Sequence, residues 1–145
     1  MKISTKGRYA LRMMIDIAEN QKEGSVSLKD ISKRQDISLK YLEQIVGLLT
    51  RANFVKSRRG AGGGYVLTKS PEKYTVGDIL RVTEGSLAPI TCLETEENFC
   101  PRAESCKSVK FWQGFYDTIN KYLDSAVLSD FTETEWNDPD AGKFI

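Results

Sequence analysis

Two short helical patterns separated by a tight turn place the strongest constraint on what this chain can fold into. The stretch VSLKDISKRQDISLKYLEQIVGLLTRANFV, residues 26–55, contains both patterns. Ser27 can cap the first helix and Ser38 the second, because serine is preferred at the position before a helix. In the second helix the apolar residues recur at spacings of three and four, at Leu42, Ile45, Val46 and Leu49. Two helices across so short a turn predict a helix-turn-helix.

A further helix precedes this unit. Ser4 or Thr5 can cap it, and its apolar positions again recur at three and four: Tyr9, Ala10, Met13, Met14, Ile17 and Ala18. A segment TVGDILRVTEG follows later in the chain, with Thr75 as cap and Asp78 three residues on. Its apolar residues predict a scaffold helix.

Beyond Asn53 the pattern changes from helical to extended. FVKSR and YVLTKSP read as strands, and RGAGGG joins them with glycines that permit positive φ. GAGGG fits neither a P-loop nor a dinucleotide fingerprint, and it joins a strand to a strand, so a nucleotide site is not favoured. A helix-turn-helix followed by a glycine-tipped basic hairpin predicts a winged helix.

Charge is divided unevenly along the chain. Residues 1–70 carry 14 Lys and Arg against 6 Asp and Glu, whereas residues 71–145 carry 7 against 14. The first half is therefore +8 and the second −7, which agrees with the net charge of +1. A basic half is the electrostatic signature of a polyanionic partner, although a solvated charged face is the plainer alternative. Because the predicted fold is a winged helix, we favour double-stranded DNA as the partner of the basic half.

The start of the chain shows no targeting signal. MKISTKGRYALRMM has a charge every few residues, and no stretch reaches the roughly 20 apolar residues of a membrane span. We therefore expect a cytoplasmic protein with reduced thiols and no membrane partner.

A long aromatic helix is expected near the end of the chain. Its stripe over SVKFWQGFYDTINKYLDSAVLSDF comprises Val109, Trp112, Phe115 or Tyr116, Ile119, Tyr122 or Leu123, and Ala126. Such a stripe is too aromatic for an exposed surface, and DNA readers commonly dimerise to match a palindromic site. We therefore expect a homodimer formed through this helix.

Four segments carry a resemblance to a known family: STKGRYALRMMIDIA, LKDISKRQDISLKYLEQIVGLL, SRRGAGGGYVL and TVGDILRVTEG. They resemble the winged-helix repressors to which the iron-sulfur cluster assembly regulator IscR belongs. That family also includes a nitric-oxide sensor and the cysteine-metabolism repressor CymR, and the short acidic tail ending GKFI looks more like the latter. The resemblance implies DNA binding and a homodimer, not an enzyme.

The expected fold is mainly α with a small β-hairpin, and it divides into four parts. These are a winged helix-turn-helix domain over 1–85, a cysteine-containing loop over 86–107, a dimerisation helix over 108–131 and an acidic tail over 132–145.

The predicted DNA-contacting residues lie on the second helix of the helix-turn-helix and at the hairpin: Ser38, Lys40, Tyr41, Glu43, Gln44, Arg58, Arg59 and Gly60. Leu39, Leu42 and Ile45 are assigned to the buried stripe or its border. Gln44 can pair with adenine, Glu43 with a cytosine amine, and Lys40 with guanine or a phosphate, each good base contact being worth roughly 1–3 kcal/mol. Several of these residues would contact only phosphate in the alternative interpretation. The resemblance implies a site-selecting role for Glu43 and a minor-groove role for Arg59, with Arg58 beside it.

All three cysteines, Cys92, Cys100 and Cys106, lie within one short stretch, TCLETEENFCPRAESCKS. A disulfide would leave one thiol over, and zinc needs a fourth donor and usually closer spacing. A 2Fe-2S cluster accepts donors other than thiolate on one iron. We therefore predict a 2Fe-2S cluster on the three cysteines.

The fourth ligand of such a cluster is not identified by the sequence. The chain has no histidine, and the positions that supply the ligand in IscR and in the nitric-oxide sensors are here Val109 and Arg8. The candidates are a partner subunit's acid, water, a small thiol, or one of Glu94, Glu96, Glu97, Glu104, Ser105 and Ser108.

The sequence thus predicts a transcriptional regulator whose promoter binding is controlled by a 2Fe-2S cluster, governing cluster-assembly genes. The alternative is a cofactor-free repressor of cysteine or sulfur metabolism, controlled by thiol oxidation or by a partner protein from cluster assembly or cysteine synthesis. A thiol redox enzyme is disfavoured, because the chain has no C-x-x-C and no histidine base.

Overall fold

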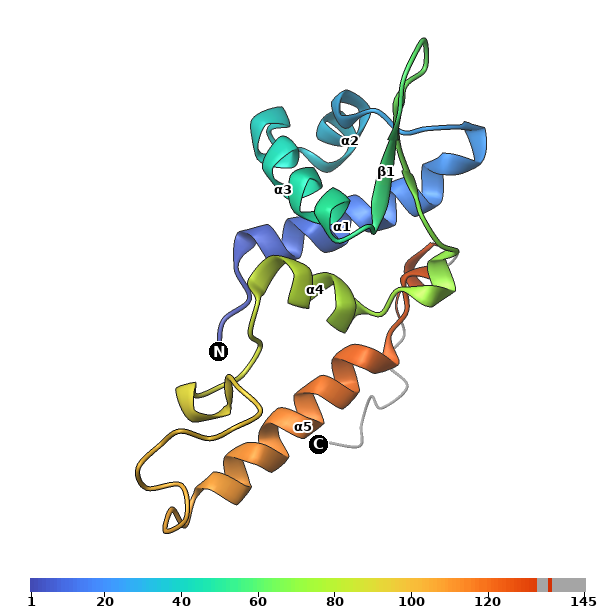
Figure 1. Cartoon of the computed structure of the whole chain (residues 1–145). Helices are drawn as coiled ribbons and strands as arrows, with labels where there is room; N and C mark the ends of the chain where they lie inside the picture. The colour runs from blue at the N-terminus through green and yellow to red at the C-terminus, as the bar shows by residue number, and fades with distance from the viewer. Residues whose placement is uncertain (133–135, 137–145) are drawn as a thin grey trace.

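The computed structural model describes residues 1–132 and 136. In Figure 1, the helices of the N-terminal part and a hairpin lie together at the top, and the long helix near the end of the chain lies below them beside a long loop. The main elements follow in the order α1 (Thr5–Asn20), α2 (Leu28–Gln35), α3 (Leu39–Arg51), β1 (Val55–Arg58), β2 (Gly64–Leu67), α4 (Val76–Glu84) and α5 (Val109–Ser125). Short 3-10 turns occur at Gln21–Glu23, Pro71–Lys73, Thr91–Leu93 and Leu128–Phe131. Most of the expected tail over 132–145 lies outside the described residues.

The predicted helix starts are confirmed by their caps. The hydroxyl groups of Ser4, Ser27 and Ser38 accept hydrogen bonds from backbone amides in the first turns of α1, α2 and α3. Thr75 and Asp78 form a reciprocal capping box at the start of α4. These caps satisfy amide groups that have no partner within the helix, and they fix where each helix begins.

The helix-turn-helix encloses one apolar core together with α1. The fully buried side chains include Met13, Met14, Ile17, Ile31, Leu42, Ile45 and Leu49. Asp36 ends α2 in the left-handed conformation, with φ 53°, and so turns the chain towards α3. The core and the turn together give the predicted helix-turn-helix.

The hairpin is anchored at its base and glycine-rich at its tip. Its antiparallel register pairs Val55 with Leu67 and Arg58 with Gly64. At the base, the Tyr74 hydroxyl donates to the carbonyl oxygen of Phe54 at 2.8 Å and accepts from the amide of Lys69 at 3.0 Å. At the tip, Gly60 and Gly62 have φ values of 105° and 76°, which favour glycine.

The end of the chain returns to the core. The helix expected over 108–131 ends at Ser125, and Ala126 is extended. Val127 then forms an antiparallel bridge with Thr75, and Leu128 is fully buried in the main core. Leu128 packs in the main core against α1, and the chain has to leave the axis of α5 to reach this position. The helix therefore ends before Leu128.

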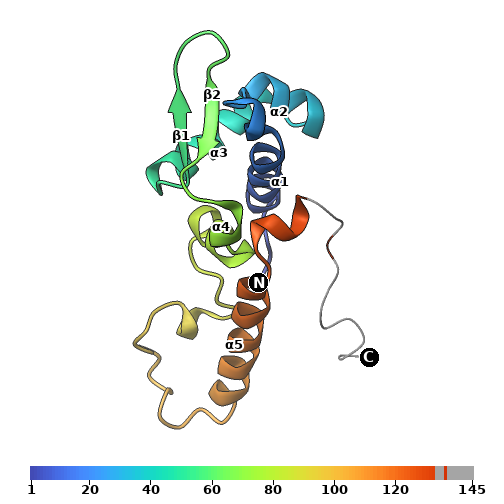
Figure 2. The ribbon, with the colours of Figure 1, turned by 90° about the vertical axis from the view of Figure 1, so that its right-hand side faces the viewer.

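α5 is attached to the rest of the chain mainly through α4. Arg81 of α4 forms an ion pair with Asp124 at 2.8 Å and donates a hydrogen bond to Asn120. Figure 2 shows α5 below α4, with the cysteine loop running down one side of it. Within the residues that the structure describes, no helix is both long and apolar enough to cross a bilayer.

Candidate nucleic-acid interface and cysteine loop

The outer face of α3 presents polar side chains next to the hairpin. Lys40, Glu43 and Gln44 are exposed there, opposite the buried stripe of the same helix. In Figure 1 the hairpin extends beyond the helices on the side of α2 and α3. A helix with exposed hydrogen-bonding groups beside a projecting hairpin has the arrangement needed to read a major groove and contact an adjacent groove.

Two predicted DNA contacts on α3 are already partly engaged within the chain. The Ser38 hydroxyl caps α3 by accepting from the amide of Tyr41 at 3.2 Å. The Tyr41 ring is half-buried and packs edge-on against Tyr9, with ring centroids 5.6 Å apart. These two residues therefore position the start of α3. DNA can contact only those parts of their side chains that are not used in these interactions.

Leu39 lies at the border of this face. It was expected on the buried stripe or beside it, and with 36% exposure it lies beside the stripe, whereas Leu42 and Ile45 are fully buried. It precedes Lys40 in the first turn of α3, where an apolar side chain can contact a thymine methyl group.

The hairpin carries the predicted basic group at its tip. Arg58, Arg59 and Gly60 are all exposed. The Ser25 hydroxyl donates to the carbonyl of Gly62, and Val26 pairs with Tyr65 beside β2. The tip is thus tethered at one side while both arginine side chains stay free of ion pairs in the described part of the chain.

The cysteine loop has almost no apolar support of its own. No residue from Ala88 to Ser125 is buried, although several are half-buried. Phe99 is 75% exposed in the middle of the loop. A long segment without buried side chains gains little from packing, which is typical of functional loops.

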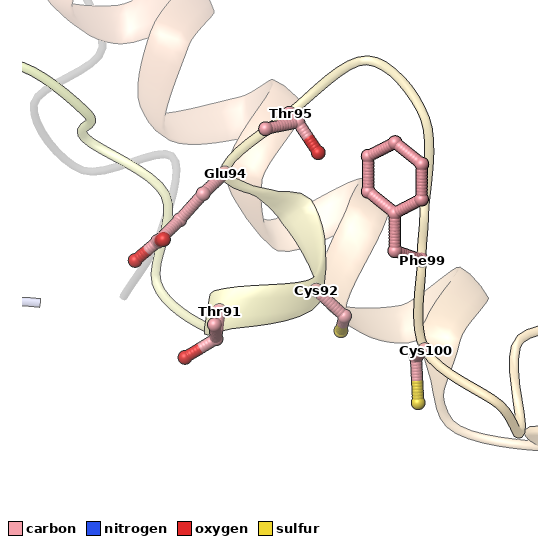
Figure 3. Close-up of a pocket in the computed structure, with 6 residues that line it drawn as sticks. All are labelled: Thr91, Cys92, Glu94, Thr95, Phe99 and Cys100. Carbon is pink, nitrogen blue, oxygen red and sulfur yellow. The ribbon is translucent and has the colours of Figure 1, made fainter.

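The structure brings two of the three cysteines together. Cys92 and Cys100 line one pocket with Thr91, Glu94, Thr95 and Phe99, and their side chains point to the same side in Figure 3. Cys106 lines a different hollow, with Arg102, Ser105 and Lys107. All three thiols are free, and Cys106 does not share the pocket of the other two.

The Cys106 thiol has a distinct environment. A hydrogen bond from the Ser108 hydroxyl, with Sγ and Oγ 3.5 Å apart, is the main cause of a lowered pKa. The backbone amide of Ser108 acts in the same direction, burial opposes it, and the backbone amide of Val109 and the charge of Arg102 lower the pKa further. A lowered pKa favours the thiolate, which is the metal-binding and nucleophilic form.

The candidate fourth ligands are scattered. Glu94 shares the pocket of Cys92 and Cys100, but its carboxylate points away from both sulfurs in Figure 3. Glu96 lines the neighbouring hollow together with Val109, and Glu97 and Glu104 are exposed. Across residues 1–132 and 136, no three His, Cys, Asp or Glu side chains are grouped as a metal site. The donor chemistry of the cysteines fits an iron-sulfur cluster, while their present arrangement gathers only two of them.

The outer face of α5 is apolar and uncovered. Phe111, Phe115 and Tyr122 are 66%, 42% and 40% exposed, and they lie on one side of the helix at spacings of four and seven. No residue of α5 is buried in a single chain. Exposed aromatic side chains aligned in this way indicate a contact surface.

Comparisons with known proteins identify the family. A sequence model of the Rrf2 family, described as "Iron-dependent Transcriptional regulator", matches residues 3–134. The chain is 46% identical to the transcriptional regulator CymR of Bacillus subtilis over 130 residues, which cover 90% of this chain and 88% of that protein.

Solved structures agree with this assignment. The structure of B. subtilis CymR, described as the global cysteine regulator, has a TM-score of 0.75 and 45% identity and covers 91% of this chain and 96% of that one. IscR from T. potens has a TM-score of 0.71 and 40% identity, covering 90% and 85% of the two chains. The predicted winged-helix fold and the absence of enzymatic function are confirmed by these relatives, which are regulators and not enzymes. The chain therefore belongs to the Rrf2 family of DNA-binding transcriptional regulators.

Proposed function

We propose that this regulator binds a palindromic promoter site as a homodimer, and that a 2Fe-2S cluster on Cys92, Cys100 and Cys106 controls this binding. The observation that carries the proposal is the position of the cysteines. All three lie on one exposed loop between the DNA-binding part and α5. A cofactor held there acts both on the orientation of the recognition helix α3 and on the dimer contact through α5.

The DNA contacts are divided between two elements. The exposed Lys40, Glu43 and Gln44 of α3 read base edges in a major groove, and Arg59 at the hairpin tip enters the adjacent minor groove with Arg58 beside it. Gly60, with φ 105°, allows the backbone to turn immediately after these arginines.

The homodimer is formed through α5. The exposed aromatic face of Phe111, Phe115 and Tyr122 packs against the same face of a second copy, as in a two-fold symmetric contact. This symmetry matches two recognition helices to the two halves of a palindrome.

The cysteine side chains provide the ligand set. Cys92 and Cys100 already share a pocket, and the Ser108 hydroxyl holds Cys106 towards the thiolate form that ligates iron. When bound, a 2Fe-2S cluster supplies iron-thiolate bonds that tie the loop together and that depend on iron and oxidant levels. The Cys106 end of the loop has to approach the other two cysteines.

The loop is connected to the DNA-binding part directly at one end and through α5 at the other. Glu84, directly before Gly85, accepts hydrogen bonds from the amide and the hydroxyl of Ser4 at the start of α1, at 3.0 and 2.6 Å. The other end of the loop leads into the start of α5 at Val109, and this helix is held to α4 near its C-terminal end, where Asp124 pairs with Arg81. A change in loop order therefore acts on the DNA-binding part at Glu84 and along the length of α5, with the 1–3 kcal/mol of coupling, in order of magnitude, that is typical of allosteric proteins.

The test is an anaerobic purification followed by absorption spectroscopy and iron and sulfide analysis. We expect a coloured protein, and we expect Cys92→Ala, Cys100→Ala and Cys106→Ala each to remove the colour and the effect of iron on promoter binding. Ser86→Ala, at the start of the same loop, is the matched control and should retain both. If the cysteine variants respond to iron as the wild type does, the cluster proposal is wrong.

A second candidate function is supported by a specific observation. The chain is 46% identical to CymR, and only two cysteines share a pocket. On this alternative the protein is a cofactor-free repressor of cysteine metabolism, controlled by thiol oxidation or by a partner protein from cysteine synthesis or cluster assembly. A colourless anaerobic protein whose promoter binding changes on treatment with hydrogen peroxide supports it.

A further inference from the structure

We infer that Asp16, buried on α1, is a positioning residue that orients the recognition helix α3 for sequence-specific DNA binding. Its side chain is 1% exposed, and it is the one charged residue in the core of the described part of the chain. Burial of a carboxylate is unfavourable unless the group is paired and fully hydrogen-bonded. This inference rests on DNA binding by the family and is independent of the cysteine loop.

The Asp16 carboxylate is held by the last turn of α2. Arg34 donates to both carboxylate oxygens, from Nη2 to Oδ1 at 2.7 Å and from Nε to Oδ2 at 3.0 Å. Gln35 also donates, from Nε2 to Oδ2 at 3.0 Å. Bidentate arginine-carboxylate pairs fix direction as well as distance. One carboxylate on α1 therefore sets the rotation of the end of α2.

A second side chain of α1 completes this clamp. Arg12, one turn before Asp16, donates from Nε to the side-chain oxygen of Gln35 at 3.1 Å and from Nη2 to its backbone carbonyl. Gln35 is therefore held through its amide nitrogen, its amide oxygen and its backbone. We refer to Asp16, Arg12, Arg34 and Gln35 as the polar clamp.

The polar clamp lies next to the start of α3. After Gln35 only the left-handed Asp36 and the buried Ile37 precede Ser38, the cap of α3. A turn this short transmits the direction of the end of α2 to the first turn of α3. The exposed residues expected to read bases are in the first two turns of that helix.

Apolar packing alone does not provide this orientation. The apolar contacts of α2 with the core are few: Ile31 is fully buried, and Leu28 is half-buried in the first turn. Hydrophobic contact is non-directional, so these two side chains in the first half of α2 do little to fix the direction of its last turn. α3 is anchored by four buried side chains along its length, but the direction of its first turn depends on the segment that leads into it. The polar clamp supplies that constraint.

Specific and non-specific DNA binding respond differently to a loss of orientation. Base contacts carry the sequence information and need the first turn of α3 at one depth and angle in the groove, whereas phosphate contacts are available on a duplex of any sequence. Asp16→Asn keeps the size of the side chain but removes the charge and points an amide group at the donors of Arg34 and Gln35. We therefore expect it to reduce specific binding more than non-specific binding.

The experiment uses the full chain and two DNA duplexes. One is the duplex that the wild type enriches from a randomised pool, and the other is a scrambled duplex of the same composition. By fluorescence anisotropy at fixed salt, we expect Asp16→Asn to weaken binding to the enriched duplex roughly 5- to 150-fold, the equivalent of one lost base contact. Binding to the scrambled duplex should change by less than about twofold, because it depends on phosphate contacts. Glu19→Gln, an exposed acid on the same helix, is the control and should leave both affinities unchanged.

Two results would overturn the inference. Equal losses on both duplexes would mean that Asp16 contributes only to the amount of folded protein, and unchanged affinities for both duplexes would mean that it contributes nothing to orientation. If circular dichroism shows that Asp16→Asn is unfolded, Gln35→Ala decides the question, since it opens one side of the polar clamp while the buried Asp16 keeps its ion pair with Arg34. A folded Gln35→Ala protein with the wild-type ratio of the two affinities would then reject the role of the clamp.

Discussion

Replacing Tyr74 with phenylalanine removes one hydroxyl group that joins both ends of the hairpin. The Tyr74 side chain is 1% exposed. Its hydroxyl donates to the carbonyl of Phe54 before β1, and it accepts from the amides of Thr68 and Lys69 after β2, at 2.8, 3.1 and 3.0 Å. The ring itself also packs edge-on against Phe54, and phenylalanine keeps that contact.

The expected loss follows from which groups keep a partner. The amide of Thr68 and the carbonyl of Phe54 still hydrogen-bond to each other at 3.3 Å. Lys69 is exposed, so its amide can turn to water. Water therefore replaces the bond from Lys69, whereas the bonds of the hydroxyl to Phe54 and Thr68 are not fully replaced. At about 1 kcal/mol each, the loss of these two bonds lowers the free energy of unfolding by about 2 kcal/mol. For a chain of this length that corresponds to a fall in melting temperature of about 4–8 °C.

Urea unfolding followed by circular dichroism measures this change as a shift in midpoint at constant slope. Tyr65→Phe is the matched control, because the Tyr65 ring is half-buried on β2 and its hydroxyl forms no hydrogen bond with any residue that the structure describes. We expect the control to change stability by less than about 0.5 kcal/mol, the usual range of surface substitutions. If Tyr74→Phe is as stable as this control, the hydroxyl does not anchor the hairpin.

Three further predictions concern other parts of the molecule. Phe111→Gln should weaken the homodimer roughly tenfold or more, since it removes an exposed phenylalanine from the proposed contact; sedimentation equilibrium measures this, and an unchanged dissociation constant excludes that face. Gly64→Ala should destabilise the fold by more than about 1 kcal/mol in urea unfolding, because a Cβ there would lie 2.3 Å from a backbone carbonyl oxygen and the backbone would have to shift. Gly47→Ala, which meets nothing within 4 Å on α3, should instead stabilise it by about 0.5–1 kcal/mol. Because the pKa of Cys106 is lowered, its alkylation by iodoacetamide in metal-free protein should remain fast at a pH where a free cysteine is protonated, and Ser108→Ala should move the inflection to higher pH; mass spectrometry that finds no such movement contradicts the role of the hydroxyl.

The features that could be predicted from the sequence are those determined locally. The caps at Ser4, Ser27, Ser38 and Thr75 depend on residues within three positions of each other, and all four are present. The glycine-tipped hairpin likewise follows from its own residues. Local patterns with known geometry therefore led to the winged helix before any tertiary contact was known.

The features that could not be predicted depend on residues far apart in the chain. Asp16 lies in an apolar stretch of α1, and its partner Arg34 is 18 residues away. The helix expected to run to residue 131 ends at Ser125, because Leu128 is buried in the core of the DNA-binding part. The three cysteines are close in sequence, but an exposed loop places Cys106 apart from the other two. The spacing of apolar residues in the sequence cannot show which of these contacts form, because the free energy of each contact depends on which distant residues the fold brings near it.

The loop from Ala88 to Ser108, in which no residue is buried, has a consequence for how such proteins diversify. Insertions, deletions or exchanged ligands in a segment outside the core change folding stability little. A lineage can therefore acquire a new signal by altering this stretch while keeping the promoters it already recognises. Evolution of what is sensed and evolution of what is read are separable in this architecture.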